Sequence, residues 1–178
     1  MLVKTIDEIV AKYPWPPCTF EASLRVLLSH IQADPEMEDQ RWVAYLLATA
    51  RWETQYTYSP VEENGKGAGH SYGVPDPQTG KAYYGRGYVQ ITFKDNYARF
   101  SPIVGQDLVN HPELALEPDV AYKIASVGMR GGMFTGVGLH HYIHDDVADY
   151  VNARRIINGL DKADTIASFA EAFEKILK

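Results

Sequence analysis

Apolar side chains recur at helical spacing along much of the 178-residue chain. The strongest pattern covers residues 38–54, where Trp42, Leu46 and Ala50 mark one continuous apolar stripe. A second pattern covers residues 19–34 and has Thr19 at the N-cap position. Further helical patterns cover residues 5–13, 94–104, 117–134, 149–159 and 161–178. The chain is therefore predicted to be mostly helical.

The segment from residue 59 to 87 interrupts this periodicity. It is rich in glycine, proline and turn dipeptides, which indicates loops or a hairpin. The next residues, 88–92 (YVQIT), alternate as a short strand does, with Tyr88, Gln90 and Thr92 on one face. Long loops inside compact domains are usually functional. We expect a single domain over residues 1–178, of mostly α (α+β) class, with a small β-hairpin lobe.

Composition narrows the function classes. Lys and Arg number 17 and Asp and Glu number 23, and the net charge of −6 argues against broad electrostatic capture of nucleic acid. The single cysteine, Cys18, excludes an intrachain disulfide. The N-terminal stretch MLVKTIDEIVAKYPWPP contains no apolar run long enough for a signal peptide or a membrane span. We therefore expect synthesis in the cytoplasm, no stable membrane insertion, and a monomer.

Glu53 is the first candidate for chemistry. Counting back three, seven and eleven residues reaches Ala50, Leu46 and Trp42, so Glu53 falls on the apolar stripe. A carboxyl group at the edge of an apolar face, close to the negative end of a helix dipole, is suited to keep and then donate a proton. The alternative is a surface carboxylate on a frayed last turn, or one that pairs with Arg51 or an arginine elsewhere.

Glu62 and Glu63 follow in the loop directly after this helix. Two carboxyl groups that flank a glycosidic bond are what glycoside hydrolysis requires, although acidic pairs in loops are usually just solvated. A metal site is less favoured. His140 and His144 have the spacing of helical metal ligands, but the chain lacks a His-Glu-x-x-His motif. The Gly-Arg-Gly at 85–87 likewise lacks the third glycine of a nucleotide loop.

Four segments carry a resemblance to a known family. They are ATARWETQYTYSPVEEN (48–64), YYGRGYVQITFKDNY (83–97), GMRGGMFTG (128–136) and NARRIING (152–159). Together they resemble family 19 of the glycoside hydrolases. The resemblance is closest to the phage and prophage branch of that family, which comprises endolysins and chitinase-like proteins with a lysozyme-like α fold. It covers residues 44–177 of the chain.

The resemblance implies catalytic roles for the matching residues. Glu53 matches the general acid, and Glu63 matches the second carboxylate, with Glu62 as the alternative base. Thr92 matches the hydroxyl residue that helps to hold the attacking water. Trp52 stands where many members have a histidine before the acid, a change that removes no group the mechanism needs.

The resemblance also implies substrate contacts. Gln90 and Asn96 match residues that bind sugar amide and hydroxyl groups, and Asn158 matches an amide that contacts substrate or water. Tyr84 is available to stack on a sugar face, and Arg86 to orient a carboxylate. Either Arg154 or Arg155 matches an electrostatic partner of the acidic pair.

The expected activity is hydrolysis of β-1,4 bonds in an N-acetylhexosamine polymer by an inverting two-carboxylate mechanism. Inversion requires the two carboxyl groups to lie roughly 6.5–9.5 Å apart. Neither a cofactor nor a metal is implied. The resemblance favours a bacteriophage endolysin, a bacteriolytic, lysozyme-like enzyme that degrades cell-wall peptidoglycan after holin-type release. The alternatives are a chitinase and a non-catalytic saccharide-binding or virion protein.

Overall fold

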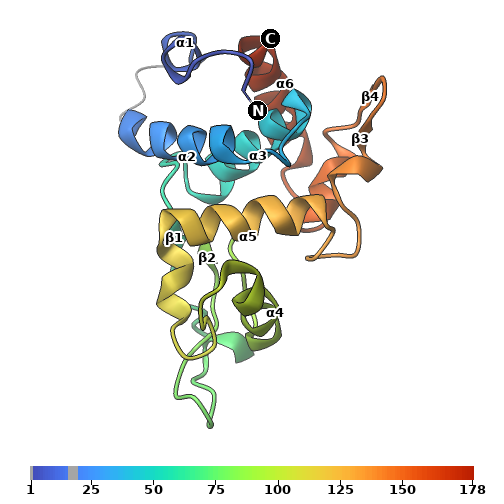
Figure 1. The fold of residues 1–178 in the computed structure, drawn as a ribbon. Helices are drawn as coiled ribbons and strands as arrows, with labels where there is room; N and C mark the ends of the chain where they lie inside the picture. The colour runs from blue at the N-terminus through green and yellow to red at the C-terminus, as the bar shows by residue number, and fades with distance from the viewer. Residues whose placement is uncertain (1, 16–19) are drawn as a thin grey trace. The chain divides into compact units, whose positions relative to one another are not determined.

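The computed structural model describes residues 2–15 and 20–178, and these are mostly helical (Figure 1). The α-helices are α1 (Ile6–Ala11), α2 (Glu21–Ala33), α3 (Gln40–Glu53), α4 (Lys94–Val104), α5 (Pro118–Arg130) and α6 (Ala163–Leu177). Four short strands form two antiparallel pairs. In the first, β1 (Val61–Glu62) pairs with β2 (Arg86–Gly87), and in the second, β3 (Ile143–His144) pairs with β4 (Val147–Ala148). Short 3-10 helices include η1 (Ser71–Gly73), η2 (Pro112–Leu116), η3 (Leu139–His141) and η4 (Asn152–Ile156). The predicted fold class, mostly α with a small β-hairpin, is confirmed.

The chain divides into two compact units. Unit 1 comprises Met1–Tyr58 and Ser126–Lys178, and unit 2 comprises Ser59–Ala125. The loop-rich segment predicted from its glycine and proline content lies in unit 2, together with the β1–β2 hairpin and α4.

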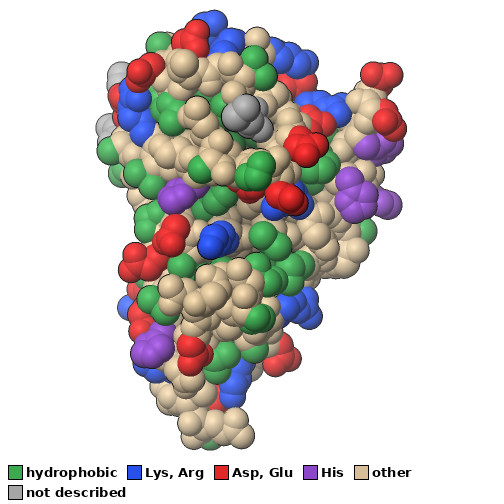
Figure 2. Space-filling model, viewed as in Figure 1, with side chains coloured by type: hydrophobic (Ala, Val, Ile, Leu, Met, Phe, Trp, Pro, Cys, Tyr) green, Lys and Arg blue, Asp and Glu red, His purple; other side chains and the backbone are tan. Residues whose placement is uncertain are grey.

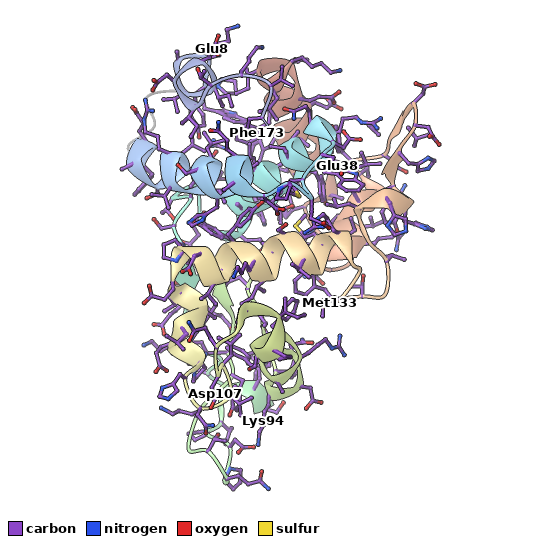
Figure 3. The ribbon with its side chains drawn as sticks, in the orientation of Figure 1. Glu8, Glu38, Lys94, Asp107, Met133 and Phe173 are labelled. Carbon is purple, nitrogen blue, oxygen red and sulfur yellow. The ribbon has the colours of Figure 1, made fainter. Side chains whose placement is uncertain are left out.

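Unit 1 is built around the packing of α3 against α6. Every residue of α3 from Val43 to Ala50 is buried, so its middle turns are enclosed on all sides rather than along one stripe. In α6 the buried stripe includes Ala170 and Phe173, the second of which is labelled in Figure 3. This enclosure gives α3 a fixed position, and Glu53 is its last residue.

Unit 2 places its short sheet against helical segments. In the hairpin, Val61 pairs with Gly87 and Glu62 pairs with Arg86. The 3-10 helix η2 packs against β2. Directly after the hairpin, α4 turns Tyr97 into the core of the unit. The hairpin is therefore a supported element, although each of its strands is only two residues long.

The predicted strand over residues 88–92 is wrong. Arg86 pairs with Ile91, and the residues between them form a tight turn in which Gly87 and Gln90 have φ values of 89° and 56°. Tyr88 is buried inside this turn, while Gln90 is partly exposed, so the two do not share one face of a strand. Five alternating letters are too few to separate a strand from the turn that closes a hairpin.

Three helix boundaries also differ from the prediction. Residues 149–159 form only the 3-10 helix η4, and the helix predicted over 117–134 ends at Arg130. The helix α2 begins at Glu21 with Phe20 at its N-cap, and the predicted cap Thr19 lies outside the described residues. Among the helices that the structure describes, none has the length and apolarity to cross a membrane.

Candidate active site

Glu53 lies at the C-terminal end of α3, with 17% of its side chain exposed. The helix ends here because Thr54 takes the C-cap position, and the Thr54 hydroxyl donates to the carbonyl oxygen of Ala50 at 2.7 Å. The carboxylate therefore lies at the edge of the buried helix face, where the stripe placed it. One of its oxygens accepts a 2.6 Å hydrogen bond from Nη1 of Arg154.

Arg154 comes from η4, 101 residues further along the chain. Its side chain is only 4% exposed, and its Nε donates to the carbonyl oxygen of Asp161 at 3.1 Å. Arg155, in contrast, is exposed, and its Nε lies 3.4 Å from Oδ1 of Asn152. Arg154 is therefore the arginine that faces the acidic group. The ion pair fixes the position of the Glu53 carboxylate. Removal of either partner would leave an uncompensated buried charge, which is strongly destabilising.

Arg51, the other arginine considered as a partner of Glu53, contacts aromatic side chains instead. The centre of its guanidinium lies 3.9 Å from the centroid of the Trp15 ring and 4.9 Å from that of Phe169. One of its nitrogens also donates to the hydroxyl of Tyr58 at 3.2 Å. Arg51 thus links α3 to α6 through cation–π contacts.

Tyr45 is a neighbour of the ion pair that the sequence analysis missed. It lies two turns before Glu53 on α3 and stacks on Tyr150, with the ring centroids 6.0 Å apart and the planes 2° apart. Burial raises the pKa of Tyr45, and the nearby Arg154 charge opposes this rise only in part. The hydroxyl therefore stays neutral beside the pair. In the sequence, Tyr45 lies among the apolar positions of the helix, a pattern that indicates a core residue and no functional role.

Glu62 is the more strongly bound of the two loop carboxylates. Its Oε1 accepts a 2.7 Å hydrogen bond from the Tyr84 hydroxyl, its Oε2 lies 3.0 Å from Nζ of Lys66, and the Nε of Arg86 lies 3.7 Å from Oε1. The Tyr84 hydroxyl, aided by these two cations, holds the pKa of the Glu62 carboxyl below its ordinary value against the opposing effect of burial. Glu62 is therefore ionised at neutral pH.

Glu63 is held by the hairpin and by one tyrosine. Its Oε2 accepts from the backbone N–H of Gly85 at 3.0 Å, and its Oε1 accepts from the Tyr72 hydroxyl at 3.1 Å. Its own backbone N–H donates to the carbonyl oxygen of Gly85 at 2.8 Å. Tyr72 had no sequence signal, because it lies in the single-turn 3-10 helix η1 of the loop-rich segment, nine residues after Glu63. All of these contacts are neutral, which distinguishes Glu63 from Glu62.

Steric constraints explain why both outer positions of the Gly-Arg-Gly motif are glycine. A Cβ at Gly85 would lie 2.9 Å from Oε1 of Gln90 and 3.3 Å from Cβ of Glu63. Gly87 has a φ of 89°, a conformation that L side chains rarely adopt. The Gln90 amide nitrogen donates to the carbonyl oxygens of Val61 and Gly87 at 3.0 and 3.1 Å. Gln90 therefore braces the hairpin with its nitrogen.

Thr92 and Asn96 lie at the junction between the hairpin and α4. The Thr92 hydroxyl donates to the carbonyl oxygen of Gln90 at 2.8 Å, and Nδ2 of Asn96 donates to the carbonyl oxygen of Thr92 at 2.8 Å. Both side chains are partly exposed. The hydroxyl oxygen of Thr92 can still accept a hydrogen bond. Their roles toward water and sugar stay predictions.

Tyr84 and Arg86 are buried members of the hairpin. The Arg86 guanidinium lies 3.6 Å from the centroid of the Tyr84 ring and donates to the Tyr97 hydroxyl at 2.9 Å. The Tyr97 hydroxyl in turn donates to the carbonyl oxygen of Tyr84 at 2.7 Å, and burial raises its pKa to about 12. Tyr84 and Arg86 thus orient Glu62. Direct contact of either residue with substrate stays a prediction.

The remaining candidates lie away from these contacts. Asn158 is exposed, and its Oδ1 accepts from the backbone N–H of Gly159 at 2.8 Å. His140 lies in η3 and His144 in β3, so the helical spacing assumed for a metal site does not exist. Both histidines are exposed, and histidine side chains appear in purple on the surface in Figure 2. Within residues 2–15 and 20–178, no group of three or more potential metal ligands comes together.

Each unit thus contributes carboxyl groups to the candidate site, and their hydrogen-bond and ion-pair partners differ between the two units. Unit 1 holds Glu53 against a buried guanidinium. Unit 2 holds Glu62 and Glu63 on a braced hairpin, beside the hydroxyl of Thr92. Carboxyl groups in these surroundings can donate a proton or activate a water.

Comparisons with known proteins match the same part of the chain. Residues 44–129 match the glycoside hydrolase family 19 profile described as chitinase class I. Chitinase 3 of Oryza sativa subsp. japonica is 39% identical over 88 residues, which are 43% of this chain and 27% of that protein. Endochitinase A2 of Pisum sativum is 44% identical over 48 residues, which are 26% of this chain and 15% of that protein. The chain thus spans about a quarter or less of the length of these two relatives.

Solved structures share the fold over nearly the whole chain. Chitinase C from Streptomyces griseus HUT6037 superposes with a TM-score of 0.63 at 23% identity, covering 97% of this chain and 76% of that one. A bacterial family 19 chitinase superposes with a TM-score of 0.66 at 21% identity, covering 97% and 94%. At these identities the likeness establishes the fold. The profile match makes residues 44–129 similar to the glycoside hydrolase family 19 (chitinase class I) domain.

Proposed function

We propose that this protein is a glycoside hydrolase that cleaves the β-1,4 bonds of a chitin-type N-acetylhexosamine polymer with inversion. One observation carries the proposal. The family 19 match over residues 44–129 includes Glu53, both loop carboxylates and the braced hairpin, so the candidate groups fall inside the part of the chain that is similar to chitinases. The proposal draws on both compact units and therefore treats residues 1–178 as one catalytic domain.

In this proposal Glu53 is the general acid. A protonated Glu53 donates its proton to the glycosidic oxygen as the bond to the sugar breaks, which avoids an alkoxide leaving group. Arg154 is its positioning residue. The ion pair at 2.6 Å sets the direction of the carboxyl group before the proton arrives and stabilises the carboxylate once the proton has left.

The base in this proposal is Glu63. Its two oxygens are held by a tyrosine hydroxyl and a backbone N–H, both neutral, so no cation competes for the proton that it must take from water. Glu62 is already engaged by Lys66 and Tyr84 and serves better to fix the hairpin. Thr92 is proposed to hold the attacking water, and Gln90, Asn96 and Asn158 to contact the sugar.

The substrate is proposed from the relatives. The proteins that match the chain are chitinases of plants and bacteria, which favours chitin. Peptidoglycan, with the same linkage and acetamido group, is the second candidate, favoured by the resemblance of the motif set to phage endolysins. In that case the protein would be made in the cytoplasm and act on the cell wall after holin-type release.

The test is mass spectrometry of the fragments released from soluble chitin oligosaccharides and, in parallel, from purified peptidoglycan. Cleavage of chitin oligosaccharides supports the proposal. Muropeptides with a reducing muramic acid and no chitin cleavage would establish the endolysin alternative. No product from either polymer would indicate a non-catalytic saccharide-binding or virion protein and would contradict the proposed activity.

A further inference from the structure

A hollow of about 290 Å³ lies in unit 2, outside the groups assigned to the reaction. Its walls include Tyr72, Val74, Asp76, Phe93 and Lys94. The volume is close to the lower end of the roughly 300–1,000 Å³ range of small-molecule sites, which have mostly apolar walls and a few fixed polar groups. It is therefore of the size that suits one small ring rather than an extended segment.

Phe93 is an unusual residue for this position. Its side chain is 53% exposed, and its backbone has a φ of 71° and a ψ of 137°, a region that bulky L residues almost never adopt. The conformation is held by a 2.8 Å hydrogen bond from its N–H to the carbonyl oxygen of Tyr83. Its ring meets that of Tyr72 edge to face, with the centroids 5.2 Å apart. Strained, exposed residues of this kind are typical of ligand sites.

Another part of the lining of the hollow is polar. Nζ of Lys94, labelled in Figure 3, lies 3.0 Å from each carboxylate oxygen of Asp76 and 3.3 Å from Oε1 of Gln78. The loop is closed by backbone N–H groups of Gln78 and Thr79 that donate to Oδ1 of Asp76. The two charges neutralise each other, and the three N–H groups of Lys94 all donate to Asp76 and Gln78. This part of the lining therefore offers the remaining acceptor capacity of the Asp76 carboxylate to the O–H and N–H groups of an uncharged ligand.

Two residues that line the hollow, Tyr72 and Phe93, are neighbours of proposed catalytic residues. The hydroxyl of Tyr72 is the group that donates to Oε1 of Glu63, and Phe93 follows Thr92 in the chain. A molecule that touches Tyr72 and Phe93 therefore lies next to the groups proposed to activate water. A sugar ring matches this chemistry, because its faces are apolar and its edge carries hydroxyl and amide groups.

We propose that the hollow formed by Tyr72, Val74, Asp76, Phe93 and Lys94 is a saccharide subsite that binds one N-acetylhexosamine ring of the polymer. This inference rests on the proposed function and extends it. The Phe93 and Tyr72 rings contact the faces of the sugar, and the Asp76 carboxylate, held in place by Lys94, accepts hydrogen bonds from its polar edge.

The test uses the full chain with Glu53→Gln, so that the oligosaccharide stays intact, and measures chitin hexasaccharide affinity by calorimetry. We expect Phe93→Ala in this background to weaken binding about tenfold, and Lys94→Ala to weaken it by a smaller factor. The matched control is Phe20→Ala, which removes an exposed phenylalanine of unit 1 and should leave the affinity unchanged. Phe93→Gly should weaken binding as much as Phe93→Ala while unfolding at a higher temperature, because glycine adopts positive φ without strain.

Hydrolysis of the hexasaccharide by the unaltered chain is measured alongside. Hydrolysis together with equal affinity of the Phe93→Ala variant and its parent would overturn the subsite and leave the proposed function standing. Absence of hydrolysis together with a tenfold loss at Phe93 would overturn the proposed function and keep a saccharide site. Absence of any hexasaccharide binding by the parent, or binding only of peptidoglycan stem peptide, would also overturn the subsite.

Discussion

Glu53 in unit 1 and the Glu62–Glu63 pair in unit 2 are held by different means. The partner of Glu53 is one buried guanidinium that comes from 101 residues further along the chain. The partners of Glu62 and Glu63 are hydroxyls, one N–H, a lysine and an arginine, all from residues 66–86 of the same hairpin and loop. The position of Glu53 therefore depends on the packing of a helical core, and the positions of Glu62 and Glu63 depend on the closure of a short loop.

This difference separates two kinds of sensitivity. Changes around Glu53 should affect folding and catalysis together, because Arg154 is buried and its charge is matched by one carboxylate. Changes around the hairpin should affect catalysis more than global stability, because its contacts are local and partly exposed. The predictions below test whether the two sites separate in this way.

The largest effect is expected from Glu53→Gln. Glutamine keeps an oxygen acceptor for Arg154 but has neither the acidic proton nor the negative charge. Hydrolysis should therefore fall about 10³- to 10⁴-fold, and the protein should still fold but be less stable. Rates on chitin hexasaccharide and circular dichroism measure the two effects. Full activity of a folded Glu53→Gln protein would remove Glu53 from the mechanism.

The hairpin carboxylates should differ from each other. We expect Glu63→Gln to lower the rate about 10²- to 10³-fold, because the base that activates water is lost. Glu62→Gln should cost far less activity, since Glu62 is already engaged by Lys66 and Tyr84. The opposite ranking, measured under the same conditions, would make Glu62 the base.

Arg154→Ala should destabilise unit 1 and lower activity. It leaves the Glu53 carboxylate, 17% exposed, without its cation, which costs about 3 kcal/mol of the free energy of unfolding. Chemical denaturation measures this loss, and Arg155→Ala is the matched control at an exposed arginine, where the change should stay within about 0.5 kcal/mol. Equal stability of the two variants would show that the buried ion pair does not hold the end of α3.

The smallest effect is expected from Tyr84→Phe, and it should depend on pH. Removal of the hydroxyl deletes the main cause of the lowered pKa of Glu62, so that pKa should rise toward its ordinary value of 4.5. A lowered pKa adds stability that is present above the unfolded-state value and is lost as the pH falls through the folded-state value. The stability difference from the unaltered chain should therefore be about 1 kcal/mol at pH 7 and should shrink below about pH 4.5.

Denaturation curves at several pH values measure this prediction. A stability difference that stays constant from pH 7 to pH 3 would show that the hydroxyl contributes by packing alone. A difference that grows in acid would contradict the assignment of Tyr84 as the partner that keeps Glu62 ionised.

The helical core was predictable from sequence because its signal is local. The stripe through Trp42, Leu46 and Ala50 specified both the helix and the side on which Glu53 lies, although residues 43–50 of α3 are in fact buried on every side. The composition of residues 59–87 likewise specified loops and turns. The turn at residues 88–90 was missed because its backbone depends on Gly87 and Gln90 at positive φ, which a five-residue alternation does not reveal.

Most hydrogen-bond and ion-pair partners of the site residues could not be predicted from the sequence. Resemblance narrowed the cation near Glu53 to two adjacent arginines, but only the packing of η4 turns Arg154 inward and leaves Arg155 outside. Tyr72 became a partner of Glu63 through the path of the loop-rich segment, in which the single turn of η1 is too short to give a periodic pattern. Contacts that depend on long-range packing or on irregular loops have no local signal.

The most direct test of the central claim is the anomeric form of the first product. Proton NMR recorded within the first minutes of chitin hexasaccharide cleavage distinguishes the two outcomes before mutarotation. An inverting mechanism with a separate acid and base predicts that the new reducing end appears as the α anomer. A product that appears first as the β anomer would contradict the proposed roles of Glu53 and Glu63.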